Sequence, residues 1–222
     1  MTRGTLHTIA IAMLLALLAA ATLSAQNFVA PTQTKGAKDI EVWSGLVVAQ
    51  HDGSTAFNNE FWMAGVRFGH VMTAVHGSGW LRGTLQWDFD LIPVFAVSNL
   101  QSAYGVEINP IVGRWNFARK SRVASYFEMS GGLAFTNTKI PPGDTSKGNF
   151  VGSVGYGWQI FRHQQRAIDV GVHAWHLSNA WTAPQNPSAN GIQVTLGYHW
   201  YGVRPQRSAN SAGESESASE GK

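Results

Sequence analysis

The stretch WLRGTLQWDFDL, at residues 80–91, alternates large apolar side chains with polar and charged ones. One parity holds Leu81, Leu85, Trp87, Phe89 and Leu91. The other parity holds Trp80, Arg82, Thr84, Gln86, Asp88 and Asp90. Successive side chains of a β-strand point to opposite faces, so this strand has one apolar face and one polar face. An apolar exterior around a polar interior is the pattern of a transmembrane β-barrel.

The same alternation recurs along the chain between turn-rich breaks. We count eight such segments, each long enough for the 9–11 residues of a tilted membrane strand. They lie at residues 40–51, 60–72, 79–92, 103–117, 123–136, 148–161, 166–178 and 189–202. The sequence therefore predicts an all-β fold, an eight-stranded antiparallel transmembrane β-barrel over residues 40–203.

Parity also predicts which side chains face the barrel interior. The inward set contains Arg67, Arg82, Asp88, Glu107, Glu128 and Asp169. The outward set of the fourth segment contains Val106, Ile108 and Val112. A soluble sandwich or a lipocalin-like barrel is the alternative, with its apolar face turned inward. Ionised groups from so many strands disfavour it, because inside a narrow membrane barrel they can pair with one another.

The chain ends predict export to the outer membrane of a bacterium. Arg3 precedes an apolar run from Ile9 to Ala21, and small residues follow up to Ala25, which is typical of a cleaved signal peptide at residues 1–25. The mature chain would begin at Gln26, with a periplasmic segment at residues 26–39. Residues 204–222 are rich in Ser, Glu, Ala and Gly, and we expect a disordered tail.

Composition excludes several classes of function. The 222 residues include 24 glycines and 9 tryptophans but no cysteine, so a disulfide framework and a thiolate metal site are excluded. The net charge is only +3, and the basic residues are scattered along the sequence, so nucleic-acid binding is not expected. Three histidines, His51, His70 and His199, have no acidic partner at ligand spacing, and we expect no metal and no cofactor.

Turn lengths predict the orientation of the strands. The connections at residues 118–122 and 162–166 are short, as expected on the periplasmic side. Those near residues 52–59, 137–147 and 179–188 are longer, as expected outside the cell. The seventh strand then runs outward, and its last residues lie in the outer leaflet.

That seventh segment carries the candidate catalytic residues. Its outward parity consists of Ile168, Val170, Val172, Ala174, His176 and Ser178. A histidine facing lipid is costly and indicates a function. A neighbouring imidazole can act as general base and activate a serine hydroxyl as nucleophile. The alternative is a polar pair that reaches toward lipid headgroups.

The segment from His176 to Ala180, together with Asn186, resembles the lipid A 3-O-deacylase family of outer-membrane acyloxyacyl hydrolases. The resemblance implies that His176 is the catalytic histidine and Ser178 the nucleophile, with Asn186 helping to form the oxyanion hole; Asn179 is a second candidate for that hole. It also implies hydrolysis of the ester at the 3-position of lipid A, without a metal. The family's third catalytic residue is a glutamate, and the matching position here is Asn190.

Asn190 has outward parity, which suits a partner for His176, whereas Gln193 has inward parity. An asparagine can orient an imidazole but cannot stabilise the imidazolium as a carboxylate does. The sequence therefore predicts an outer-membrane esterase acting on lipid A of lipopolysaccharide. The alternatives are a non-catalytic barrel with a structural or lipopolysaccharide-binding role, and an acyltransferase acting on the same lipid. Whether the chain forms homodimers is left open.

Overall fold

The computed structural model describes residues 28–49, 60–98 and 102–202. The predicted signal peptide, the start at Gln26, His51, the loop at 52–59 and the tail at 204–222 lie outside these residues. The elements are η1 (Pro31–Gln33), β1 (Lys38–Ala49), β2 (Glu60–Val71), η2 (Gly79–Leu81), β3 (Gly83–Ser98), β4 (Ala103–Phe117), β5 (Val123–Ile140), β6 (Ser146–His163), β7 (Arg166–Ser178) and β8 (Ala189–Gly202).

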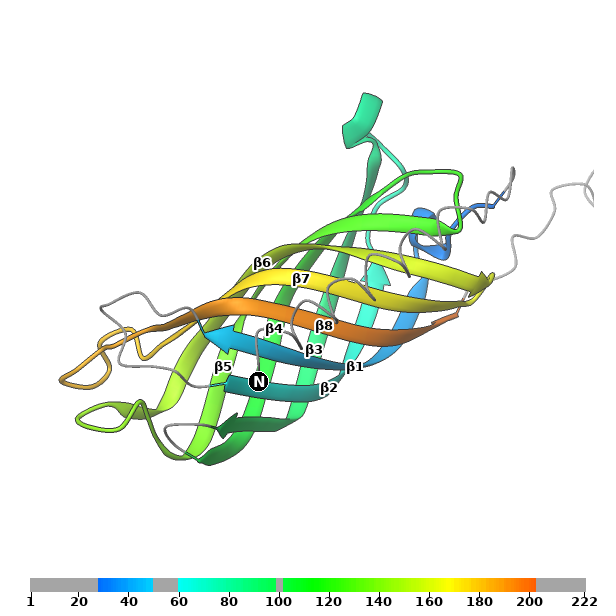
Figure 1. The fold of residues 1–222 in the computed structure, drawn as a ribbon. Coiled ribbons are helices and arrows are strands. Elements are labelled where there is room, and N and C mark those ends of the chain that lie inside the picture. Colours follow the sequence, from blue (N-terminus) through cyan, green and yellow to red (C-terminus); the bar gives the residue numbers. More distant parts are fainter. Residues whose placement is uncertain (1–27, 50–59, 99–101, 203–222) are drawn as a thin grey trace, which may run out of the picture.

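In the described residues, eight antiparallel strands follow one another around a closed barrel (Figure 1). The barrel closes where β1 pairs with β8, in a register that joins Lys38 to Gly202 and Val48 to Ile192. The predicted fold class is confirmed, and each predicted segment corresponds to one strand. Closure satisfies the backbone hydrogen bonds of both edges, which is what a sheet in lipid requires.

The third strand begins later than predicted. Gly77 and Gly79 have positive φ angles of 83° and 58°, and the chain forms the single 3-10 turn η2 before β3 starts at Gly83. Trp80 and Arg82 therefore precede the strand and are exposed rather than inside the barrel, with Trp80 73% exposed. Parity was wrong here because it was counted through a turn.

A β-bulge in β4 overturns a second prediction. Ile108 pairs with Leu133 and Ile111 pairs with Gly131, so β4 has one more residue than β5 between these pairs. An extra residue reverses the parity that follows it. Val112 is consequently buried inside the barrel, whereas Ile111 is 69% exposed. The same reversal turns Arg114 inward.

The interior has three layers. At one end, Phe28 and Ala30 of the N-terminal segment pack with Phe161 and Tyr201 and close the barrel. Ionised side chains fill the middle. Beyond them, at the end that bears Ser178, lies an apolar cluster. It contains Trp43, Val47, Phe61, Met63, Ile92, Phe95, Val97, Ala103, Ala134, Ile140, Val151, Trp175, Leu177 and Ala189. The interior is thus less polar than the alternation predicted.

The ionic layer is organised around two arginines. Arg67 donates to Asp90 at 2.6 Å and to Glu128 at 2.7 Å, and Arg114 donates to the same oxygen of Glu128 at 2.7 Å. Arg114 also lies 4.0 Å from the centroid of the Tyr126 ring. These contacts join strands β2, β3, β4 and β5 through the middle of the barrel, so the ionic layer braces the wall.

The connections follow the expected asymmetry only in part. Those at 118–122 and 164–165 are short, but the one between β2 and β3 at the same end spans residues 72–82 and contains η2. At the other end β5 and β6 extend to Ile140 and Ser146, which shortens the predicted loop at 137–147. No helix in the described residues is long and apolar enough to cross a membrane.

Candidate active site

Strand β7 fixes the direction of the candidate catalytic side chains. Trp175 and Leu177 are buried in the apolar layer of the interior, and the Trp175 ring lies 4.7 Å from that of Phe61. Side chains alternate along a strand, so His176, which lies between these two residues, and Ser178, which follows Leu177, face outward. The apolar interior at this end therefore holds the polar pair on the lipid face.

His176 bridges the two other candidate residues. Its Nε2 lies 3.0 Å from Oγ of Ser178, and its Nδ1 lies 2.7 Å from Oδ1 of Asn190. His176 and Asn190 are paired in the register of β7 and β8. A carbonyl oxygen only accepts hydrogen bonds, so Asn190 holds the proton of the neutral imidazole on Nδ1. Nε2 is then free to accept the proton of the Ser178 hydroxyl.

Asn179 organises the loop that follows Ser178. Its N–H donates to Oδ1 of Asn186 at 3.0 Å, and its side-chain amide donates to the carbonyl of Gln185 at 2.7 Å. Its Oδ1 accepts from the N–H of Trp181 at 3.0 Å, and its carbonyl accepts from Thr182. Asn179 is only 1% exposed, and its hydrogen bonds make it the internal brace of this loop.

The brace holds two residues in the left-handed region of backbone conformation. Ala180 and Trp181 have φ angles of 50° and 63°, which costs free energy for residues other than glycine. Within the described chain, the Ala180 N–H donates to no other group. An unpaired N–H two residues after Ser178 is a donor that an oxyanion could use.

The structure thus separates the two predicted oxyanion residues. Asn186 is half-buried, and its Oδ1 is held by the Asn179 N–H, which orients its amide NH₂. The Asn179 N–H is already committed to that bond. The arrangement therefore favours Asn186 Nδ2 and the Ala180 N–H as oxyanion donors, with Asn179 positioning them.

An open groove of about 440 Å³ lies in the outer surface beside His176 and Asn190. Gly152, Ala174, Met129 and Ile192 are among the residues that line it. Gly152 is paired with His176 in the register of β6 and β7, so the groove begins beside His176. Its small and apolar side chains suit a hydrocarbon chain.

His199 has no acidic partner at ligand spacing along the sequence, but the fold brings three carboxylates to its ring. Its Nδ1 lies 2.7 Å from Oδ2 of Asp39, and its Nε2 lies 3.3 Å from Glu41 and 3.4 Å from Asp169. Glu41, Asp169 and His199 could hold a metal ion, but without one the imidazole of His199 already lies within 3.4 Å of carboxylate oxygens of Asp39, Glu41 and Asp169. Spacing along the sequence could not predict this cluster, because its members come from β1, β7 and β8. His70, in β2, is half-buried.

A family model described as lipid A 3-O-deacylase (PagL) matches residues 48–199. The chain belongs to this family. The match covers every residue of the candidate site, and it places the chain among outer-membrane ester hydrolases that act on lipid A of lipopolysaccharide. The predictions of family, enzyme class and bacterial outer-membrane location are confirmed.

Solved structures support the same fold. The chain is 16% identical in sequence to the crystal structure of the outer membrane enzyme PagL. The match has a TM-score of 0.53 and covers 71% of this chain and 97% of that chain. The N-terminal β-barrel domain of OprF from Pseudomonas aeruginosa is 8% identical, with a TM-score of 0.50 over 76% and 98%. At these identities the likeness shows the fold alone. A search of curated proteins gave no match.

Proposed function

We propose that this member of the lipid A 3-O-deacylase family cleaves its ester with Ser178 as nucleophile, His176 as general base and Asn190 as the residue that orients the imidazole. One observation carries the proposal. A serine hydroxyl, an imidazole and an amide carbonyl lie in a hydrogen-bonded row on the lipid face, with distances of 3.0 and 2.7 Å. A row of these groups at the outer end of a membrane strand can contact the ester of a lipid in the outer leaflet.

The reaction begins when Ser178 Oγ attacks the carbonyl carbon of the ester and its proton passes to Nε2 of His176. The carbonyl oxygen becomes an oxyanion, which the Ala180 N–H and the amide of Asn186 stabilise. When the tetrahedral intermediate collapses, His176 returns the proton to the sugar oxygen, which leaves as an alcohol. The acyl chain remains as an ester on Ser178.

Water then attacks the acyl-enzyme with His176 again as the base. The products are a free fatty acid, a lipid A with one hydroxyl in place of the ester, and the restored Ser178 hydroxyl. During both halves the acyl chain lies in the groove beside Gly152. Ser178, His176 and Asn190 come from one chain, so this chemistry needs no second copy.

A non-catalytic, lipopolysaccharide-binding barrel is the second candidate, and Asn190 is the observation that favours it. An amide leaves the imidazolium formed in the reaction without a charged partner. The two candidates differ in one assay. Purified protein should release fatty acid from lipopolysaccharide, and Ser178→Ala should abolish the release while the barrel stays folded. Equal and negligible release by both proteins would favour the binding role.

A further inference from the structure

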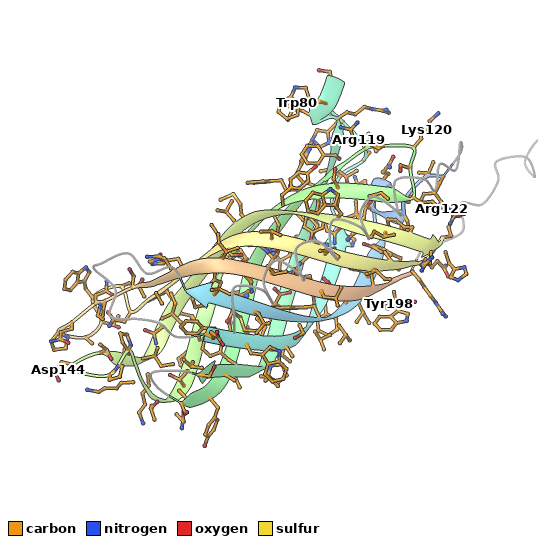
Figure 2. The ribbon with its side chains drawn as sticks, viewed as in Figure 1. Trp80, Arg119, Lys120, Arg122, Asp144 and Tyr198 are labelled. Atoms are coloured by element: carbon orange, nitrogen blue, oxygen red, sulfur yellow. The ribbon has the colours of Figure 1, made fainter. Side chains whose placement is uncertain are left out.

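The basic residues, which are scattered in the sequence, gather at one end of the barrel. Strand register places this end opposite Ser178, because the starts of β1, β3, β5 and β7 meet the ends of their neighbours there. Figure 2 shows Arg119, Lys120 and Arg122 toward this end and Asp144 at the other. The basic rim consists of Lys35, Lys38, Arg82, Arg119, Lys120, Arg122, Arg162 and Arg166.

In the described part of the chain, no carboxylate accompanies the basic rim. Seven of the nine described acidic residues are buried inside the barrel, and the other two, Glu60 and Asp144, lie at the opposite end. Every ion pair among the described residues involves interior groups, and none includes a rim residue. Arg122 donates to the carbonyl of Arg162 at 3.2 Å and lies 5.2 Å from the centroid of the Phe28 ring, but among the described residues the rim cations have no carboxylate partner.

Aromatic rings mark the membrane interface just inside the rim. Ring centroids lie 5.1 Å apart for Tyr156 and Trp158 and 4.6 Å apart for Tyr198 and Trp200. Tryptophan and tyrosine gather where acyl chains meet headgroups. Arg166 is paired with Trp200 in the register of β7 and β8. The rim cations therefore lie at headgroup depth, where long basic side chains can reach phosphate groups.

We propose that the basic rim binds the headgroups of anionic phospholipids in the inner leaflet of the outer membrane. Guanidinium groups pair with phosphate oxygens through two hydrogen bonds, and an ammonium group pairs as a point charge. The basic rim faces the periplasm because the short connections at 118–122 and 164–165 lie at this end of the barrel. The interaction depends on charge and depth, and it is independent of whether Ser178 is catalytic.

Binding at the rim would also set the depth of the active site. Arg166 and His176 are ten residues apart on β7. At about 3.3 Å per residue and a tilt of about 40°, they are separated by about 25 Å along the membrane normal. An outer-membrane barrel has an apolar band about 25 Å tall. Headgroups that hold Arg166 at the inner boundary would therefore hold His176 at the outer boundary, where the acyl esters of lipid A lie.

The test measures lipid selectivity of the full-length mature protein in bilayers. Quenching of tryptophan fluorescence by brominated phosphatidylglycerol is compared with quenching by brominated phosphatidylcholine. The rim variant combines Arg119→Gln, Lys120→Gln, Arg162→Gln and Arg166→Gln. The control is Lys147→Gln, which removes an exposed cation at the opposite end of the barrel. It is compared with the single variant Lys120→Gln, which removes one exposed cation from the rim.

We expect the wild type and Lys147→Gln to prefer phosphatidylglycerol, and each removed rim charge to reduce the preference by up to about fivefold. Salt at about 1 M, where the Debye length is about 3 Å, should reduce the wild-type preference as well. If the rim variant fails to assemble, the salt dependence of the wild-type preference still tests the proposal.

Three results would overturn the proposal. The first is equal selectivity of the wild type and a folded rim variant, and the second is a wild-type preference that salt does not change. The third is a wild type without preference that gains one when residues 204–222 are removed. That result would make the acidic residues of the tail the partner of the rim.

Discussion

The residue at position 190 offers the sharpest test of how the site works. Asn190→Asp replaces the amide by a carboxylate of the same length, so the oxygen that lies 2.7 Å from Nδ1 of His176 can stay in place. Asn190→Glu restores the residue type implied by the family resemblance, with a longer side chain. Asn190→Leu removes the hydrogen bond and leaves the imidazole without an orienting partner.

The expected gain follows from the hydrogen bond that strengthens during the reaction. A hydrogen bond between neutral groups contributes about 1 kcal/mol, and one involving charged groups about 2 kcal/mol. When His176 becomes an imidazolium, a carboxylate should therefore stabilise the transition state by about 1 kcal/mol more than the amide, which is about fivefold in rate. Desolvation of a carboxylate on a lipid-facing surface opposes this gain. We expect Asn190→Asp to gain up to about fivefold and Asn190→Glu somewhat less.

The assay is the initial rate of fatty acid release from purified lipopolysaccharide, with each variant shown to be folded by its heat-dependent gel mobility. Asn190→Leu should lose activity, by up to about 10⁴-fold if the imidazole adopts the wrong tautomer. Ser178→Ala provides the background rate. Equal rates for the wild type, Asn190→Asp and Asn190→Leu, all above that background, would show that position 190 does not act through His176.

Three further predictions concern the oxyanion donors, the groove and the interior. Asn186→Ala should lower the rate by about 10²-fold or more without loss of folding, as expected for one oxyanion donor, and unchanged kinetics would remove Asn186 from the mechanism. Gly152→Leu has room at its Cβ, with the nearest atom at 3.6 Å, and should fill the groove. Its activity on long-chain esters should fall more than on short-chain ones, and an equal fall would argue against acyl binding there. Arg114→Met leaves Glu128 short of a buried partner and should destabilise the barrel by about 3–5 kcal/mol in urea unfolding, whereas a shift under 1 kcal/mol would contradict the bracing role.

Strand alternation predicted the fold and the lipid-facing pair because each strand has one face in lipid. A period of two then assigns every side chain, including His176, Ser178 and Asn190, to a face. The rule failed where the backbone departs from regular pairing. Counting through η2 placed Arg82 inside the barrel, and the bulge in β4 reversed the face on which Val112 lies. The sequence does not reveal either departure, because neither changes the apolar and polar composition of its segment.

Other features depend on contacts between distant strands. The carboxylates around His199 come from β1 and β7, so no spacing along the chain predicts them. The basic residues form a rim only when the barrel brings four separate segments, at residues 35–38, 82, 119–122 and 162–166, to one end. The role of Asn179 as a brace depends on the loop conformation, because its hydrogen bonds with Gln185 and Asn186 exist only after the chain turns back.

The most direct test of the central claim is mass spectrometry of lipid A from cells that produce either the wild type or Ser178→Ala at equal, folded levels in the outer membrane. The account predicts that the wild type converts lipid A to a species lighter by one ester-linked acyl chain, and that Ser178→Ala leaves lipid A unchanged. Identical lipid A from both strains would contradict catalysis by the Ser178–His176 pair, whatever the loss in mass.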